Sequence, residues 1–234
     1  MKRRHFTTAV TNFAIITILG VLFVTTVFTT STSAFKQGND AVYYGNRESG
    51  KVSLMFNVYQ GEEYIPDIMK TLSDYGYSAT FFVGGVWAEK HGDLIKDMAS
   101  KGFEVANHGY LHKDCSSLSA ERIREEIIIT EKLISSYTGS AVKLFAPPSG
   151  DISDSLFKVA KTEGYKVIMW TTDTIDWRDK NADTVYSRAT KNLKAGDLVL
   201  MHPTAHTLEA LPKILEFIKG AELVCDTVTN TINE

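Results

Sequence analysis

The stretch ATFFVGGVWAEKHGDLIKDMASKGFEVANHGYLH at residues 79–112 decides the fold, because it contains one complete strand–helix–strand unit. Residues 79–83 form a short apolar run of the kind found in buried strands. Residues 86–100 predict a helix that Gly102 ends, and residues 103–106 predict a second strand. Two strands joined through a helix lie parallel in one sheet, so this unit predicts an α/β protein.

The same alternation continues on both sides of this unit. The expected strands are residues 52–56, 79–83, 103–106, 143–146, 166–170, 198–201 and 222–225. The expected helices are residues 62–75, 86–100, 119–137, 153–163, 183–193 and 208–219. This order predicts a mainly parallel sheet with helices outside, either an open doubly wound sheet or a closed or nearly closed barrel. In both forms ligands bind at the carboxyl ends of the strands. No Gly-x-Gly-x-x-Gly follows the first strand, so a dinucleotide fold has no support.

Composition excludes several classes of protein. The chain has 234 residues, of which 44% are hydrophobic and 11% aromatic, as expected for one globular domain or at most two small ones. A net charge of −3 gives no basic surface for nucleic acid. Two cysteines, Cys115 and Cys225, are too few for a disulfide framework or a cysteine-based zinc site. They either pair with each other or remain as unpaired or buried thiols. An enzyme or a binding module remains.

Residues 1–34 have the pattern of a secretory signal peptide or an uncleaved signal anchor. Basic residues near the start precede an apolar stretch at 13–28, and small residues follow it. This leader holds three of the 25 basic residues and no acid, so the remainder carries 22 basic and 28 acidic residues, a net charge of −6. We therefore predict an extracytoplasmic protein, secreted or membrane-anchored, with a linker at 35–50 and one domain at 51–234. Only the leader, if uncleaved, would contact a membrane.

Chemically active side chains gather where the predicted strands end. They include three of the six histidines and two of the three tryptophans, namely His108, His112, Trp170, Asp173, Asp176, Trp177 and His202. Since the carboxyl ends of parallel strands share one edge, we expect these residues to line one rim. This clustering is the strongest indication of a functional site in the chain.

His108 and His112 are four residues apart. This spacing places two imidazoles on one face if the segment makes a helical turn. Paired imidazoles suit zinc, cobalt, nickel or iron. The position at a strand end favours a metal pair over the alternative, two surface histidines in a polar loop.

His202 ends a buried strand and precedes a proline. Its intrinsic pKa near neutrality suits proton transfer, and the alternative is a structural histidine that caps the strand. Asp176 is a candidate to hydrogen-bond that imidazole and stabilise its cation, whereas Asp173 fits a turn better. His91 and His206 fall on predicted helices and are expected at the surface.

Pro147 and Pro148 cannot donate to a central strand ladder, so they end a strand and stiffen a wall of the site. Tyr110, Trp170 and Trp177 are candidates for sugar stacking or for plain packing at the rim, and the sequence favours neither.

These strand ends, taken in order, resemble the five motifs of the polysaccharide deacetylases of carbohydrate esterase family four, the NodB homology domain. The resemblance covers residues 51–228, and residues 79–83 and 102–108 support it. It implies a distorted (β/α)7 barrel that removes acetyl groups from N-acetylated sugars such as chitin oligomers or peptidoglycan. The first motif, SLMFNVYQG at residues 53–61, is similar to that of sporulation-associated members.

The resemblance also implies roles for individual residues. His108 and His112 correspond to metal ligands that hold a divalent ion such as zinc, cobalt or nickel. His202 corresponds to the general acid that protonates the leaving amine, and Asp176 to the carboxylate that tunes it.

Three positions depart from the family pattern. Asn57 stands where the base aspartate is expected, Val58 where the third metal ligand is expected, and Ala146 where an arginine orients the base. Losing a buried carboxylate together with its arginine leaves no unpaired charge, so the changes are physically coherent. Asparagine cannot accept the proton, and a missing general base forfeits about two to four orders of magnitude in rate. Metal occupancy is also in question, because Val58 offers no ligand.

Glu62 and Glu63 are candidates for a replacement ligand or base. Acids at these positions also favour a helix N-terminus, and that interpretation is the stronger one.

Two hypotheses follow. The first is a metal-dependent hydrolase that removes N-acetyl groups from a cell-envelope glycan such as peptidoglycan, with an altered or weakened site that includes Asn57. The second is a catalytically inactive glycan-binding module on the same fold.

Overall fold

The structure, a computed structural model, describes residues 41–233. Its strands are β1 (Lys51–Val58), β2 (Thr80–Val83), β3 (Glu104–Asn107), β4 (Leu144–Phe145), β5 (Lys166–Val167), β6 (Thr172–Asp173), β7 (Leu198–Met201) and β8 (Val224–Cys225). They form one sheet in the order β5-β4-β3-β2-β1-β7-β6, and β8 pairs with the beginning of β1. All pairings between these strands are parallel, as predicted.

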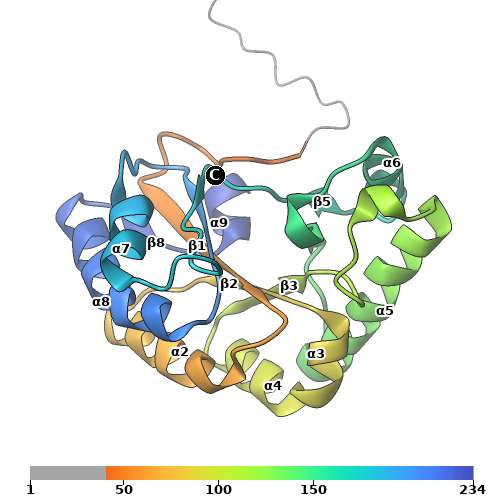
Figure 1. The fold of residues 1–234 in the computed structure, drawn as a ribbon, viewed down its shortest axis with the longest axis horizontal. Helices are drawn as coiled ribbons and strands as arrows, with labels where there is room; N and C mark the ends of the chain where they lie inside the picture. The colour runs from red at the N-terminus through yellow and green to blue at the C-terminus, as the bar shows by residue number, and fades with distance from the viewer. Residues whose placement is uncertain (1–40, 234) are drawn as a thin grey trace, which may run out of the picture. The chain divides into compact units, whose positions relative to one another are not determined.

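Helices surround the strands (Figure 1). They are α2 (Ile65–Asp74), α3 (Gly85–Lys90), α4 (Gly92–Ser100), α5 (Ala120–Thr138), α6 (Asp154–Thr162), α7 (Ala182–Thr190), α8 (Ala205–Gly220) and α9 (Val228–Asn233). Three 3₁₀ turns accompany them: η1 (Glu62–Tyr64), η2 (Cys115–Ser117) and η3 (Pro148–Gly150). The six predicted helices are present, although the one expected at 86–100 is divided into α3 and α4 at the non-helical backbone of His91. The sequence did not predict β6 or α9, which are short.

The alternation of side chains along β1 separates two cores. Leu54, Phe56 and Val58 pack among the outer helices, whereas Met55 belongs to an inner cluster enclosed by the sheet. We call this second group the inner cluster; its buried members are Met55, Phe82, Ala106, Leu144, Ala146, Ile168, Leu198, Leu200 and Val228. Asn57 follows Met55 at a spacing of two, so it lies on the inner face at the carboxyl end of β1.

Residues before Lys51 complete the barrel. Val42 bridges to Ile168, just after β5, and Tyr44 bridges to Asp197, just before β7. The N–H of Val42 donates to the carbonyl of Val167 at 2.8 Å. Residues 41–45, which fall in the predicted linker, therefore occupy the seam between the two sides of the sheet. The arrangement is the distorted barrel rather than the open doubly wound sheet.

The two cysteines are free and buried. Burial raises the pKa of Cys115 and of Cys225 to about 12, so both thiols stay protonated and poorly nucleophilic. Of the two alternatives, buried unpaired thiols is the one observed. The predicted leader at 1–34 lies outside the described residues. Within residues 41–233, the helices are too short or too polar to cross a bilayer.

Candidate active site

The two histidines after β3 come together through a loop rather than through a helical turn. Gly109 and His112 have positive φ angles of 77° and 53°, which turn the chain sharply between the two imidazoles. The ring centroids of His108 and His112 lie 5.0 Å apart. Nδ1 of His108 contacts the carbonyl oxygen of Ala146 at 2.8 Å, which fixes the Nδ1–H tautomer and leaves Nε2 with a free lone pair.

A buried carboxylate holds this loop in place. One oxygen of Glu126, on α5, accepts the backbone N–H groups of Tyr110 at 2.7 Å and Leu111 at 2.6 Å. The side chain of Asn107 accepts the N–H of Gly109 at 2.9 Å. The supporting role of Glu126 was not predicted from the sequence. The signal was present, because Glu126 lies beside Ile127 on the face of the predicted helix that faces the core.

Burial shapes the electrostatics of the histidine pair. His108 is 1% exposed, and burial, followed by the neighbouring His112, lowers its pKa to about 3. Burial also lowers the pKa of His112. Both imidazoles are therefore neutral at pH 7, the form in which histidine binds metals.

The low pKa of His108 predicts that the metal-free protein loses stability in acid. The unfolded chain takes up a proton below its ordinary pKa of about 6.5, whereas the folded state resists it down to about 3. Stability from this group is therefore present above pH 6.5 and falls toward pH 3, at up to about 1.4 kcal/mol per pH unit. Urea unfolding in EDTA at pH 7 and pH 5 should show this loss. The loss should be smaller in His108→Asn, and an equal loss in both proteins would contradict the assignment.

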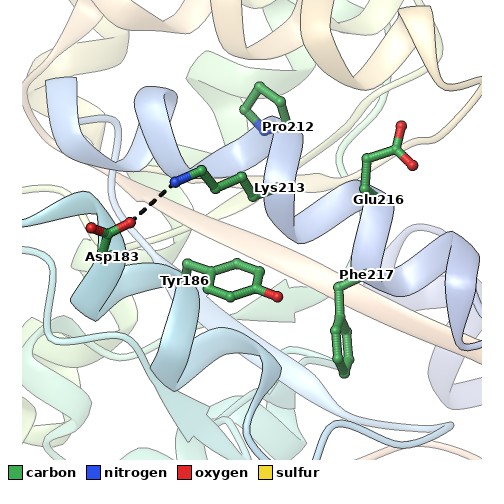
Figure 2. A pocket seen from close by; sticks show the side chains of 6 residues that line it. All are labelled: Asp183, Tyr186, Pro212, Lys213, Glu216 and Phe217. Carbon is green, nitrogen blue, oxygen red and sulfur yellow. Dashed lines mark hydrogen bonds and ion pairs between the residues drawn. The ribbon is translucent and has the colours of Figure 1, made fainter.

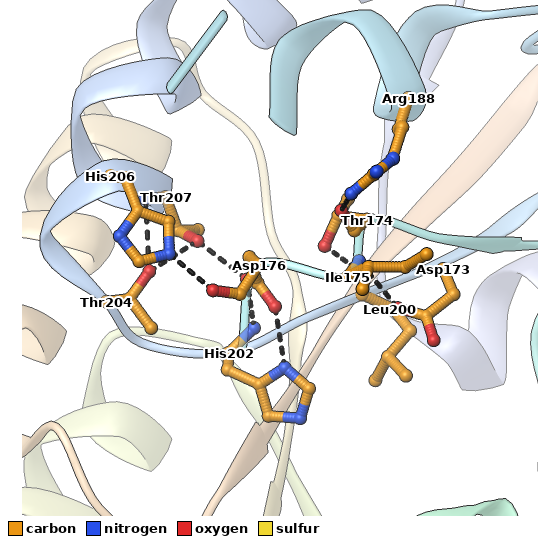
Figure 3. Close-up of polar contacts among 10 residues, drawn as sticks. All are labelled: Asp173, Thr174, Ile175, Asp176, Arg188, Leu200, His202, Thr204, His206 and Thr207. Atoms are coloured by element: carbon orange, nitrogen blue, oxygen red, sulfur yellow. Dashed lines mark hydrogen bonds and ion pairs between the residues drawn. The ribbon is translucent and has the colours of Figure 1, made fainter. Parts of the chain in front are cut away.

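The histidine after β7 is paired with a buried aspartate (Figure 3). Nδ1 of His202 lies 2.7 Å from one carboxylate oxygen of Asp176, and the backbone N–H of His202 donates to the other at 2.7 Å. Thr207 donates its hydroxyl to the same second oxygen at 2.6 Å. Asp176 is fully buried, so the carboxylate holds the Nδ1–H tautomer of His202 and fixes the orientation of its ring.

His206 is not the surface residue that the sequence predicted. Its Nε2 lies 2.5 Å from the backbone carbonyl of Asp176, and its side chain is half-buried in the first turn of α8. His206 and Thr207 thus both support the loop that carries Asp176. No sequence pattern indicates this contact, because it joins residues 30 positions apart.

The loop before Asp176 has a strained backbone. Ile175 has a positive φ of 53°, a conformation that β-branched residues rarely adopt. The side chain of Asp173 accepts the N–H of Ile175 at 2.8 Å, which confirms the prediction of a turn aspartate. Arg188 donates to the carbonyl of Thr174 at 2.9 Å and pairs with Asp179 (Figure 3 shows the contact to Thr174). These contacts keep Asp176 aimed at His202.

The positions expected to activate water and bind metal lack acidic groups. Asn57 is 4% exposed, and its Oδ1 has no hydrogen-bond partner within the described residues. Val58 is fully buried among outer-helix side chains, and Ala146 belongs to the inner cluster. Over residues 41–233, no three His, Cys, Asp or Glu side chains are grouped to hold a metal ion. The two imidazoles therefore do not complete the three-ligand set typical of a catalytic zinc site.

Glu62 and Glu63 do not supply the missing ligand. Both are exposed in η1, directly before α2, as expected for acids near a helix N-terminus. Glu62 accepts the indole N–H of Trp87 at 3.4 Å, and it does not join the two histidines in a group of metal ligands within residues 41–233. The hydrogen bond to its own backbone is the main cause of the lowered pKa of Glu62.

Tyr59 is a site residue that the sequence analysis missed. Its ring centroid lies 4.3 Å from that of His112 and 6.3 Å from that of His202. One aromatic ring therefore contacts the histidine pair and lies near the histidine–aspartate pair. The structure brings His108, His112 and His202 to one end of the barrel, since His112 lies beside His108 and the ring of Tyr59 lies near both His112 and His202.

A hollow of about 530 Å³ adjoins this cluster. It lies over the ends of β1, β2 and β3, and its lining includes Tyr59, Trp87, Lys90, Tyr110 and His112. His91 also lines it and stacks on Trp87, so His91 is not a plain surface residue.

The predicted sugar-contacting residues have different environments. Tyr110 lines the hollow and donates its hydroxyl to Glu89, while Trp177 is 54% exposed. Both are accessible to a ligand. Trp170 packs partly against the inner cluster, and Pro147 and Pro148 are buried, so these three form the wall of the barrel end.

A second hollow of about 600 Å³ lies between α7 and α8 (Figure 2). Lys213 and Asp183 form an ion pair across it at 3.1 Å, and Tyr186 and Phe217 line its wall. None of the predicted site residues lines it. It therefore provides positions for control substitutions away from the histidines.

The sequence model of one family, described as polysaccharide deacetylase, matches residues 44–168, more than half of the chain. The chain belongs to the polysaccharide deacetylase family. This membership confirms the predicted resemblance.

Similar sequences carry related names. Uncharacterized protein YlxY of Bacillus subtilis (strain 168) is 34% identical over 195 residues, which cover 83% of this chain and 61% of that protein. A peptidoglycan-N-acetylglucosamine deacetylase of Bacillus cereus is 31% identical over 189 residues, which cover 78% of this chain and 69% of that protein. The chain thus spans less than two thirds of the length of YlxY.

Solved structures confirm the fold. BA3943, a CE4 family pseudoenzyme from Bacillus anthracis, gives a TM-score of 0.81 at 34% identity, covering 84% of this chain and 70% of that one. A BA3943 mutant with restored enzymatic activity gives a TM-score of 0.81 at 33% identity, and the match covers 84% of this chain and 72% of that one. The Bc1960 peptidoglycan N-acetylglucosamine deacetylase gives a TM-score of 0.78 at 29% identity, and the match covers 81% of this chain and 91% of that one. This deacetylase-family chain therefore has the predicted NodB-like barrel.

Proposed function

We propose that this protein is an extracytoplasmic de-N-acetylase of an N-acetylated cell-envelope glycan such as peptidoglycan, and that its turnover is slow. The His202–Asp176 pair is the observation that carries this proposal. Nδ1 of His202 is held by a fully buried carboxylate at 2.7 Å, so Nε2 is the nitrogen left to protonate a departing amine. The proton-donating half of amide hydrolysis is thus retained.

The water-activating half of the reaction is weakened by Asn57 and Val58. Asn57 cannot take a proton from water, but its unpartnered, buried Oδ1 suits a hydrogen bond from the N–H of an acetamido group. His108 and His112 offer two neutral nitrogens, from which we expect weak, substoichiometric binding of zinc, cobalt or nickel. Tyr110 and Trp177 are the accessible aromatic rings for sugar contact.

A catalytically inactive glycan-binding module is the second candidate. The lost carboxylates favour it, as does the likeness to a protein described as a CE4 family pseudoenzyme. In this alternative the barrel end keeps its sugar contacts and His202 has no amine to protonate.

Acetate release distinguishes the two candidates. The protein without residues 1–34 is incubated with N-acetylglucosamine oligomers and with peptidoglycan, and bound metal is measured by mass spectrometry. We expect slow release that His202→Ala reduces by about two to four orders of magnitude. Phe217→Ala, in the hollow between α7 and α8, should leave the rate unchanged.

Other outcomes are equally informative. Binding of the oligomers without acetate release would establish the binding module instead. Neither binding nor release, from a protein with a cooperative unfolding transition, would contradict both candidates.

A further inference from the structure

The ring of Tyr59 is the group that contacts the outer member of the histidine pair. It lies against His112 with an interplanar angle of 43° at 4.3 Å, and it meets His202 edge-on, at 81° and 6.3 Å. His108, by contrast, is almost completely buried. Tyr59 and His112 both line the hollow, so the ring of Tyr59 lies next to the imidazole that a ligand in the hollow would meet.

The loop that carries Tyr59 is fixed against the turn that follows His202. Gly61 has a positive φ of 83°, and a Cβ atom added there would lie 2.0 Å from the carbonyl oxygen of Pro203. The backbone of this loop can therefore approach Pro203 only because residue 61 is glycine. This close approach determines where Tyr59 sits relative to both His112 and His202.

Tyr59 does not act as a core residue. It is 39% exposed, and it is absent from the three apolar clusters that the described residues form. A ring that combines exposure, contact with one imidazole and proximity to another has the properties of a cover.

We propose that Tyr59 is a cover over His112 that controls access to the imidazole pair, for metal ions and for the acetamido group of a glycan alike. This inference rests on the proposed function only in naming the acetamido group. Tyr59 is then a specificity-determining residue, and it slows turnover independently of Asn57 and Val58.

Chemical modification of His112 tests the cover directly. The protein is treated with diethyl pyrocarbonate at neutral pH, and modification of His112 is followed by peptide mass spectrometry in the wild type, Tyr59→Ala, Tyr59→Phe and Leu111→Ala. Tyr59→Ala should react roughly two- to tenfold faster, the range that corresponds to losing one aromatic ring contact. Tyr59→Phe keeps the ring and should react like the wild type. Leu111→Ala removes another exposed apolar side chain of the same hollow and should also react like the wild type.

Zinc binding gives a second readout that needs neither glycan nor turnover. Titration with Zn²⁺ alone should show that Tyr59→Ala binds roughly two- to tenfold tighter than the wild type, with Tyr59→Phe unchanged. Gly61→Ala, which must shift the loop, should change reactivity and zinc affinity in the same direction as Tyr59→Ala. Gly61→Ala therefore provides a second test of the cover if Tyr59→Ala folds poorly.

Equal modification rates and equal zinc affinities in the wild type, Tyr59→Ala and Gly61→Ala would overturn the cover. An effect of Tyr59→Phe as large as that of Tyr59→Ala would overturn it too, because the hydroxyl and not the ring would be responsible. Acetate release from glycans, tested separately, decides the proposed function without reference to either result.

Discussion

Replacing three residues together, Asn57→Asp, Val58→Asp and Ala146→Arg, should raise acetate release from N-acetylglucosamine oligomers by about two to four orders of magnitude. The first change supplies a carboxylate that can accept a proton from water. The second supplies a carboxylate at the position where the resemblance expects the third metal ligand, in addition to His108 and His112. Acetate release by the triple variant and the wild type, with and without added zinc, measures the gain.

The three changes have to be made together because each position is buried. Asn57 is 4% exposed, and Val58 and Ala146 are fully buried. A single new charge there lacks a partner and should cost about 3–5 kcal/mol of unfolding free energy. Asn57→Asp alone and Val58→Asp alone should therefore lower stability in urea more than the triple variant does, per added charge. A folded triple variant that binds zinc stoichiometrically but releases no acetate would sink this account of the weakened site. If the triple variant released acetate more slowly than the wild type, the wild-type residues Asn57, Val58 and Ala146 would belong to a site that already catalyses the reaction.

Glu126→Ala should lower the unfolding free energy by about 2–5 kcal/mol and should disorder the loop between the two histidines. The carboxylate of Glu126 is the acceptor for two backbone N–H groups, those of Tyr110 and Leu111, in a position that is 5% exposed. Without it, both donors lose their partner, and His112 is no longer held near His108. Urea unfolding measures the first effect, and the weakened zinc affinity of the variant reports the second.

The neighbouring Glu125 provides a matched control on the same helix. It forms a surface ion pair with Arg122, so Glu125→Ala should cost less than about 1 kcal/mol. Glu126→Gln keeps one carbonyl oxygen and should retain part of the stability that Glu126→Ala loses. If Glu125→Ala and Glu126→Ala were equally destabilising, the loop would not depend on the buried carboxylate.

The regular alternation of strands and helices predicted a mainly parallel sheet with helices outside, and the resemblance to the deacetylase family selected the barrel over the open sheet. The sequence also predicted that His108, His112, His202 and Asp176 lie at one end of the sheet, since each follows a strand and parallel strands end at the same edge. The pairing of Asp176 with His202 at 2.7 Å was predicted on the same ground. The short elements β6 and α9 carry too few residues for such a pattern to show.

The supporting residues were not predicted, because loop geometry decides their roles. Tyr59 reaches His112 through the positive φ of Gly61 and the approach to Pro203. Thr207 reaches Asp176 only once α8 has been placed against the loop at the end of the sheet. His108 and His112 meet by two left-handed backbone positions, where the spacing of four suggested a helical turn.

The pairing of Val42 and Tyr44 with the barrel determines how a shortened protein behaves. The carbonyl of Val42 accepts the N–H of Met169 at 2.8 Å, and the N–H of Gly45 donates to Gly196 at 2.7 Å. A truncated protein that starts at Lys51 lacks Val42 and Gly45, so two edges of the sheet are unpaired and exposed to water. Such edges recruit strands from other copies, so the truncated protein should aggregate. Recombinant versions of this domain therefore need to begin upstream of Val42.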